Sequence, residues 1–272
     1  MGLENVKLVA VIGAGRMGNQ IAQVASRVGG YRVIMTDVND ELVNQGLKVI
    51  RNTLQKHFVD KGKLTVEEME ATVARITGTT SLAEAAGNAD FIIEAAIENL
   101  KLKKDLHKQL DEAAPPQAIL ATNSSGLNIT EIASATKNPD KVCGMHFFNP
   151  IAVMRLIEIV RGVMTSDKTT DMACEMTRKL GKEPIVCRDV GYGFLANRAY
   201  AAMNNEAIQM VWERVASPED IDKALKLGYN LPMGPLELGD MTGRWAIHAA
   251  SEQDRIREMG EEKGRLHPLT LM

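Results

Sequence analysis

A histidine and a glutamate on consecutive apolar segments offer the clearest acid–base chemistry in the sequence. His146 ends the strand-like run 142–146, and Glu158 is the one carboxylate in the aliphatic run 156–160. A carboxylate buried in such a strand is costly unless it is paired, and His146 is the available partner if the two strands are neighbours. The carboxylate would fix the tautomer of the imidazole and leave its other nitrogen to act as a base. A core histidine near an exposed edge-strand glutamate fits the pattern equally well.

A glycine motif predicts a dinucleotide site. Gly13-x-Gly15-x-x-Gly18 follows the apolar run 7–12 and opens a helical pattern, and Asp37 ends the next strand-like run, 31–36. The glycines permit a tight turn, the approach of a pyrophosphate to the helix N-terminus, and close packing of that helix on the strand. Asp37 would accept hydrogen bonds from the adenosine ribose and repel a 2′-phosphate, which favours NAD over NADP. FAD shares this fingerprint and is the minor alternative, and a glycine-rich turn with a structural aspartate is the non-functional one.

Other catalytic arrangements find little support. Cys143 is close to His146 in sequence, but strand alternation places the two side chains on opposite faces. The five histidines are dispersed, and the sequence contains neither HExxH nor CxxC, so we predict no metal site. The nucleophile motif GxSxG and the P-loop are also missing.

The elements that must position these residues alternate along the first two thirds of the chain. Strand-like runs also occur at 91–96, 119–122 and 184–187, with helical stretches at 40–59, 101–113 and 167–180, and a capping box at Thr65 starts a further helix. After residue 188 the pattern is helical, with one long helix at 194–214 and another starting at Ser217. We therefore predict an α/β protein: a Rossmann-type doubly wound sheet that binds NAD over residues 1–188, followed by a smaller all-helical domain over residues 189–272.

Composition narrows the class of protein further. The 272 residues carry a formal net charge of −3, which argues against a nucleic-acid partner. Three widely spaced cysteines are typical of reduced thiols in a cytoplasmic protein. No run approaches the roughly 20 apolar residues that a membrane span needs, and no basic segment precedes an apolar stretch at the N-terminus. We expect a soluble, cytoplasmic chain with no membrane partner.

Several segments, in order and spacing, resemble the 3-hydroxyacyl-CoA dehydrogenase family in its short bacterial form, over essentially the whole chain. They are VIGAGRMG at 11–18, AIENL at 96–100, TNSSGL at 122–127, GMHFFNP at 144–150, GFLANR at 193–198, DIDKALKLG at 220–228 and MGPLE at 233–237. The resemblance implies NAD-dependent oxidation of an (S)-3-hydroxyacyl-CoA, such as 3-hydroxybutyryl-CoA, to the 3-ketoacyl-CoA, and the reverse reaction.

The resemblance also implies roles for individual residues. His146 would be the catalytic base with Glu158 as its orienting partner, and Asn197 would be the active-site asparagine. The active-site serine matches Ser125, with Ser124 as the alternative because Gly126 departs from the family pattern.

Further positions match the family's binding residues. Met17 lies within the glycine motif, Glu98 and Lys103 match contacts to the nicotinamide ribose, and Asn149 matches a residue near the CoA pantetheine. The basic stretch 56–63 lies where the family meets the CoA phosphates, although a solvated basic turn is an alternative.

The resemblance extends to partners. The family's second domain forms a dimer interface, so a homodimer that binds an acyl-CoA substrate is expected. Family members usually continue past the segment like residues 265–271, so the same comparison makes this chain a shortened one. Two other functions stay open: a dehydrogenase of a small hydroxy acid or sugar acid without CoA, and a non-catalytic NAD-binding protein.

Overall fold

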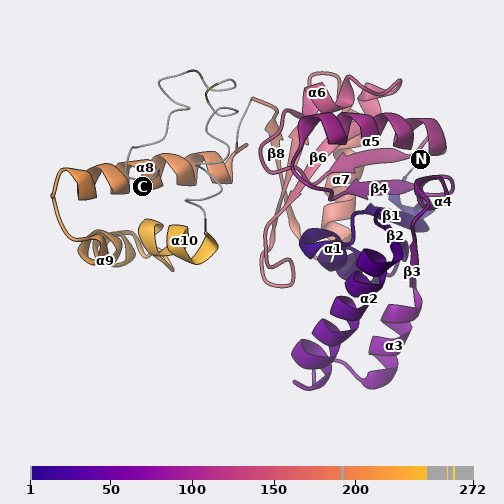
Figure 1. Cartoon of the computed structure of the whole chain (residues 1–272), viewed down its shortest axis with the longest axis horizontal. Coiled ribbons are helices and arrows are strands. Elements are labelled where there is room, and N and C mark those ends of the chain that lie inside the picture. The colour runs from indigo at the N-terminus through magenta and orange to yellow at the C-terminus, as the bar shows by residue number, and fades with distance from the viewer. Residues whose placement is uncertain (1, 191–192, 244–255, 257–259, 261–272) are drawn as a thin grey trace. The chain divides into compact units, whose positions relative to one another are not determined.

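The computed structural model describes residues 2–190, 193–243, 256 and 260. It contains an eight-stranded sheet in the order β3-β2-β1-β4-β5-β6-β7-β8 (Figure 1). The strands are β1 (Leu8–Ile12), β2 (Arg32–Thr36), β3 (Ile76–Thr79), β4 (Phe91–Glu94), β5 (Ile119–Thr122), β6 (Val142–Phe147), β7 (Leu156–Arg161) and β8 (Glu183–Arg188). Strands β1 to β6 run parallel to one another, β7 is antiparallel to β6, and β8 is parallel to β7. The Rossmann-type doubly wound sheet is confirmed.

Seven α-helices within residues 2–190 connect or follow these strands, and all of them except the first begin at a side chain that caps the first turn. They are α1 (Arg16–Arg27), α2 (Asp40–Leu54), α3 (Val66–Ala74), α4 (Leu82–Ala86), α5 (Leu100–Ala113), α6 (Ile129–Ala133) and α7 (Asp167–Lys179). Thr65 and Glu68 form the predicted capping box at α3. Helix α2 ends five residues earlier than the predicted 40–59 and continues as a π-helical turn, Gln55–Val59. Helices α2 and α3 stand side by side as an arm below the sheet (Figure 1).

Three short elements were not predicted: strand β3 and helices α4 and α6. Strand β3 has the sequence ITGT with two exposed residues, and it pairs only with β2 at the edge of the sheet. Its place in the sheet comes from backbone hydrogen bonds to β2 rather than from an apolar pattern, which is why periodicity missed it.

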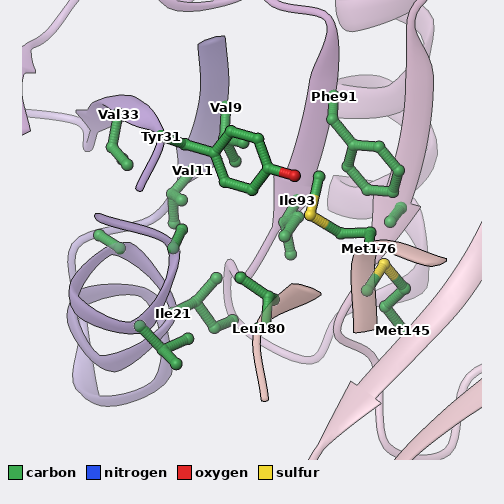
Figure 2. Packing of buried hydrophobic residues seen from close by; sticks show 14 of the residues in the cluster. Val9, Val11, Ile21, Tyr31, Val33, Phe91, Ile93, Met145, Met176 and Leu180 are labelled. Atoms are coloured by element: carbon green, nitrogen blue, oxygen red, sulfur yellow. The ribbon is translucent and has the colours of Figure 1, made fainter. Parts of the chain in front are cut away.

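The sheet is buried on both faces because its central strands are almost continuously apolar. On one face Val9, Val11 and Ile93 pack with Ile21 of α1 and Leu180 just after α7 (Figure 2). On the other face alternate residues of the same strands, among them Ala10 and Ile92, pack against α4, α5 and α6. Side chains in the middle of these strands are therefore committed to the core, and those at the carboxyl ends of the strands can reach a ligand.

The chain divides into two compact units, residues 1–190 and 191–272. Within the second, α8 (Ala196–Trp212), α9 (Pro218–Tyr229) and α10 (Pro235–Thr242) enclose a small core of Ala207, Ile208, Ile221 and Leu236. Ser217 caps α9 and Pro218 is its first residue, as predicted. Among the described residues, no helix is both long enough and apolar enough to cross a membrane.

Candidate active site

The predicted site residues of the first unit gather at one end of the sheet, where the parallel strands have their carboxyl ends. Gly13, Asp37 and Glu98 follow the carboxyl ends of β1, β2 and β4, and Ser125 follows that of β5. His146 is near the carboxyl end of β6, which is parallel to β5. Open α/β sheets bind ligands at this end, next to the point where the strand order reverses, here between β1 and β4.

His146 and Glu158 face each other across the antiparallel pair β6–β7. The imidazole Nδ1 lies 2.7 Å from Oε2 of Glu158, and the two residues are 5% and 0% exposed. Because a carboxylate oxygen only accepts, Nδ1 carries the proton in this bond and Nε2 carries the lone pair. The Phe148 ring lies 4.4 Å from the imidazole, centroid to centroid, and limits its rotation. These contacts orient His146 so that its Nε2 can accept or donate a proton.

The glycine loop has the shape of a pyrophosphate cradle. A Cβ on Gly18 would lie 1.8 Å from the carbonyl oxygen of Gly13, so α1 can pack this closely only with glycine there. A Cβ on Gly15 would meet nothing within 4 Å, which leaves that side of the loop open. Gly15 is the N-cap of α1 and offers no capping side chain. Such a helix N-terminus attracts phosphate oxygens, so the loop fits NAD.

Asp37 ties the glycine loop to β2. Its Oδ2 accepts a hydrogen bond of 2.7 Å from the backbone N–H of Ala14, and its Oδ1 accepts one of 2.8 Å from Val38. Each carboxylate oxygen has a second lone pair, so Asp37 can also accept from ribose hydroxyls. The sequence predicted the ribose contact and missed the tether to Ala14.

Glu98 connects the loops that follow β4 and β5. Its Oε1 accepts hydrogen bonds from the Ser124 hydroxyl at 2.6 Å, from the Ser125 N–H at 2.9 Å and from the Gly126 N–H at 3.1 Å. Ser124 is fully buried, and its hydroxyl also accepts from the N–H of Leu127. Ser125 is exposed at this end of the sheet. Ser124 thus bonds within its own loop, and the exposed Ser125 also donates from its hydroxyl to Oε1 of Glu98, at 3.4 Å.

Lys103 lies in a buried cluster that the sequence did not predict. Its Nζ lies 2.6 Å from Oε1 of Glu94, the last residue of β4, and 3.7 Å from Oε2 of Glu98. The other oxygen of Glu94 accepts from the Thr122 hydroxyl at 2.7 Å. His107, fully buried, donates from Nδ1 to the carbonyl of Lys103, and burial lowers its pKa. Glu94 gives the same signal as Glu158, a lone carboxylate in an apolar strand, and could have been found by the same argument.

The remaining predicted residues lie on separate elements. Asn149, exposed after β6, accepts a hydrogen bond of 3.0 Å from Gln20 of α1, and Gln20 in turn accepts from the N–H of Ile151. Gln20 therefore joins the dinucleotide-binding helix to the loop after His146, a link that the sequence gave no sign of. Met17 is half-buried in α1 against the core, and Asn197 is half-buried at the start of α8 in the second unit.

Burial makes the thiol nearest to His146 in the sequence unreactive. The pKa of Cys143, fully buried, rises to about 12 because burial disfavours the thiolate. The residues that the structure describes contain no group of three or more His, Cys, Asp or Glu side chains suited to a metal ion.

Comparison with known proteins decides the family. The model of the 3-hydroxyacyl-CoA dehydrogenase NAD binding domain matches residues 8–190, and that of the C-terminal domain matches residues 193–271. The chain belongs to the 3-hydroxyacyl-CoA dehydrogenase family. This membership confirms the resemblance and the predicted enzyme class, an NAD-dependent oxidoreductase acting on 3-hydroxyacyl-CoA.

Individual members of the family are similar over most of their length. A probable 3-hydroxybutyryl-CoA dehydrogenase of Deinococcus radiodurans is 44% identical over 259 residues, which cover 95% of this dehydrogenase and 91% of the relative. The human mitochondrial hydroxyacyl-coenzyme A dehydrogenase is 41% identical over 88% of this chain and 76% of its own. The crystal structure of (S)-3-hydroxybutyryl-CoA dehydrogenase from Ralstonia eutropha is similar with a TM-score of 0.91 and 39% identity, and the match covers 98% of this chain and 92% of the other.

Proposed function

We propose that this dehydrogenase interconverts short-chain (S)-3-hydroxyacyl-CoA, with 3-hydroxybutyryl-CoA as the reference substrate, and 3-ketoacyl-CoA, and that His146 is its catalytic base. The observation that carries the proposal is the 2.7 Å hydrogen bond from His146 to the buried Glu158 at the ligand-binding end of the sheet. The relatives named 3-hydroxybutyryl-CoA dehydrogenase support the choice of substrate.

In the oxidation direction, Nε2 of His146 accepts the proton of the substrate's 3-hydroxyl group. Glu158 stabilises the imidazolium that forms, because its carboxylate already accepts the Nδ1 proton. The hydrogen on C3 leaves as hydride, and NAD, when bound, supplies the acceptor for it. Ser125 holds the 3-oxygen, and Asn197 contacts the substrate's thioester region. In the reverse direction the same imidazolium returns the proton to the oxygen.

Cofactor and substrate are held by different parts of the chain. The glycine loop with Met17, Asp37 and Glu98 takes NAD, and Asn149 lies near the pantetheine of CoA. Lys56, Lys61 and Lys63 lie on and after the π-helical turn that follows α2, and all three are exposed and offer cations to the CoA phosphates. Charge complementarity between these lysines and a nucleotide phosphate is the reason we prefer a CoA thioester to a free hydroxy acid.

The test is the decrease in NADH absorbance when acetoacetyl-CoA is added to the purified protein. We expect turnover by the wild type, and a His146→Gln variant that binds NADH normally but turns over at least 100-fold more slowly, because general-base catalysis contributes about 10²–10⁴-fold. A variant that keeps more than about a tenth of the wild-type rate would remove His146 from this role.

We also propose a cytoplasmic homodimer formed by the second unit. Six large apolar side chains on α8, α9, α10 and the residues beside them are more than half exposed: Leu195, Trp212, Val215, Leu227, Tyr229 and Met241. Large exposed apolar patches mark protein–protein contacts. Gel filtration with light scattering tests this, and a monomer at micromolar concentration would contradict it.

A further inference from the structure

A buried ion pair lies beneath the loops that carry the proposed site. Glu94 is 0% exposed and Lys103 is 1% exposed, and Nζ of the lysine lies 2.6 Å from Oε1 of the glutamate. Residues of these two types are almost never fully buried unless they are paired. A well-packed apolar pair at such a position is often as stable, so stability alone does not explain the charges.

The ion pair fixes the ends of two strands. Oε1 of Glu94 also accepts a hydrogen bond of 2.6 Å from the N–H of Ala96, and Nζ of Lys103 donates one of 3.2 Å to the carbonyl of the same residue. Oε2 of Glu94 accepts from the hydroxyl of Thr122 at the end of β5. The loops after β4 and β5 therefore start from one buried anchor.

The anchor reaches the proposed site through Glu98. In the described part of the chain, Lys103 contacts two carboxylates, Glu94 at 2.6 Å and Glu98 at 3.7 Å. The other oxygen of Glu98 holds the loop of Ser125 by accepting from four donors. The side chain of Glu98 is 40% exposed, so these bonds, rather than packing, set its position.

We propose that Glu94 is a positioning residue that neutralises Lys103 so that Glu98 stays bonded to the serine loop, in place for cofactor and substrate. Without the Glu94 carboxylate, the buried ammonium has Glu98 as its near counter-ion. Glu98 then turns toward Lys103 and releases the loop of Ser125. This inference rests on the proposed function, because Glu98 and Ser125 are assigned there to the cofactor and to the substrate.

The variant Glu94→Gln keeps the shape of the side chain and removes its charge. We expect the dissociation constant of NADH, measured by fluorescence titration without substrate, to rise about tenfold. We expect kcat for acetoacetyl-CoA to fall ten- to a hundred-fold, because a displacement of about 1 Å in a catalytic group can cost 10²-fold. The KM for acetoacetyl-CoA should change less than kcat, since the basic stretch 56–63 proposed to bind the CoA phosphates belongs to other elements than Glu94.

The sharper test repeats the substitution in a Lys103→Met background. If Glu94 acts by neutralising the ammonium, Glu94→Gln should change NADH binding and kcat less than threefold there, or improve them, because no buried cation is left to balance. If Glu94 is only a structural anchor for Ala96 and Thr122, the loss will be the same in both backgrounds, and the proposal is overturned. If the single variant Glu94→Gln fails to fold, the double variant is compared with Lys103→Met alone: a change of less than threefold supports the proposal, and a loss of tenfold or more overturns it.

The matched control is Asp105→Asn on α5, the helix that carries Lys103. It removes the carboxylate from an exposed lysine, Lys101, whose Nζ lies 2.9 Å away, and should leave binding and turnover unchanged. Wild-type kinetics and NADH binding in Glu94→Gln, or a lower melting temperature with no other change, would also overturn the proposal. Failure of the proposed function looks different: the wild type itself would bind NADH and leave acetoacetyl-CoA unreduced.

Discussion

Replacing Glu158 by glutamine should slow catalysis by about a thousandfold while the fold and the cofactor site persist. The carboxylate is fully buried and accepts the Nδ1 proton of His146 at 2.7 Å. The positive charge of an imidazolium is spread over the ring, about 4 Å from the carboxylate, and at an effective dielectric constant near 20 the attraction is about 4 kcal/mol. At 1.4 kcal/mol for each factor of ten, its loss lowers kcat about 10³-fold.

An amide at position 158 also disturbs the tautomer. Its NH₂ group can donate to Nδ1, which would place the imidazole proton on Nε2 and block the proposed base. In serine protease triads, replacing the orienting carboxylate by an amide lowers kcat about 10⁴-fold for this reason. A loss between 10² and 10⁴ is therefore consistent with the geometry.

The assay follows NADH absorbance in both reaction directions, with NADH fluorescence titration to show that cofactor binding changes less than about twofold. Glu183→Gln, the same substitution at the exposed start of the neighbouring strand β8, is the control and should behave as wild type. A Glu158→Gln enzyme that binds NADH and retains more than a tenth of wild-type kcat would refute the orienting role.

Four further predictions concern the cofactor loop, His107 and two cysteines. Gly18→Ala places a Cβ 1.8 Å from a backbone carbonyl oxygen and should lower the melting temperature. Gly15→Ala meets no protein atom within 4 Å, so it should leave the melting temperature unchanged and weaken NADH binding. Equal effects of the two variants in calorimetry and in NADH titration would contradict the assignment of this loop to the pyrophosphate. His107→Phe removes a buried Nε2 that has no hydrogen-bond partner and should stabilise the fold by about 1 kcal/mol, seen as a rise of about 2–4 °C in melting temperature at neutral pH. Because burial lowers the pKa of His107 below its usual 6.5, the unfolded chain binds its proton first as the pH falls; wild-type stability should be lost below about pH 6.5, less so in His107→Phe, and parallel pH profiles would argue against this. Cys143, which is buried, and Cys187, which is half-buried, have pKa values that burial raises to about 12 and about 11. Both should react slowly with iodoacetamide at pH 8 until the protein unfolds, and rapid labelling of the native protein would contradict these raised pKa values.

The sequence predicted those elements whose local residue pattern is enough to indicate burial or a helix start. Strand β1 is apolar at every position and buried at every position, and Ser217 followed by proline starts α9 as expected. Strand β3 depends on a partner strand brought from elsewhere in the chain, so local patterns could not reveal it.

The same distinction holds for the site. His146 and Glu158 pair because β6 and β7 are adjacent antiparallel strands. A single carboxylate in an apolar strand requires a partner, which is why the sequence could predict this pair. Lys103 matched a contact to the nicotinamide ribose by resemblance, and nothing in the sequence indicated that its position on α5 points it at Glu94 of β4. The bond between Gln20 and Asn149 joins residues 129 positions apart and carries no sequence signal.

The central claim is that this dehydrogenase acts on a CoA thioester, and the most direct measurement compares acetoacetyl-CoA with free acetoacetate as substrates for NADH-dependent reduction. Remote binding energy from the CoA moiety serves to align the reacting carbon, so kcat/KM for the thioester should exceed that for the free acid by at least about 100-fold. Equal values for the two substrates, or a preference for free acetoacetate, would contradict the account.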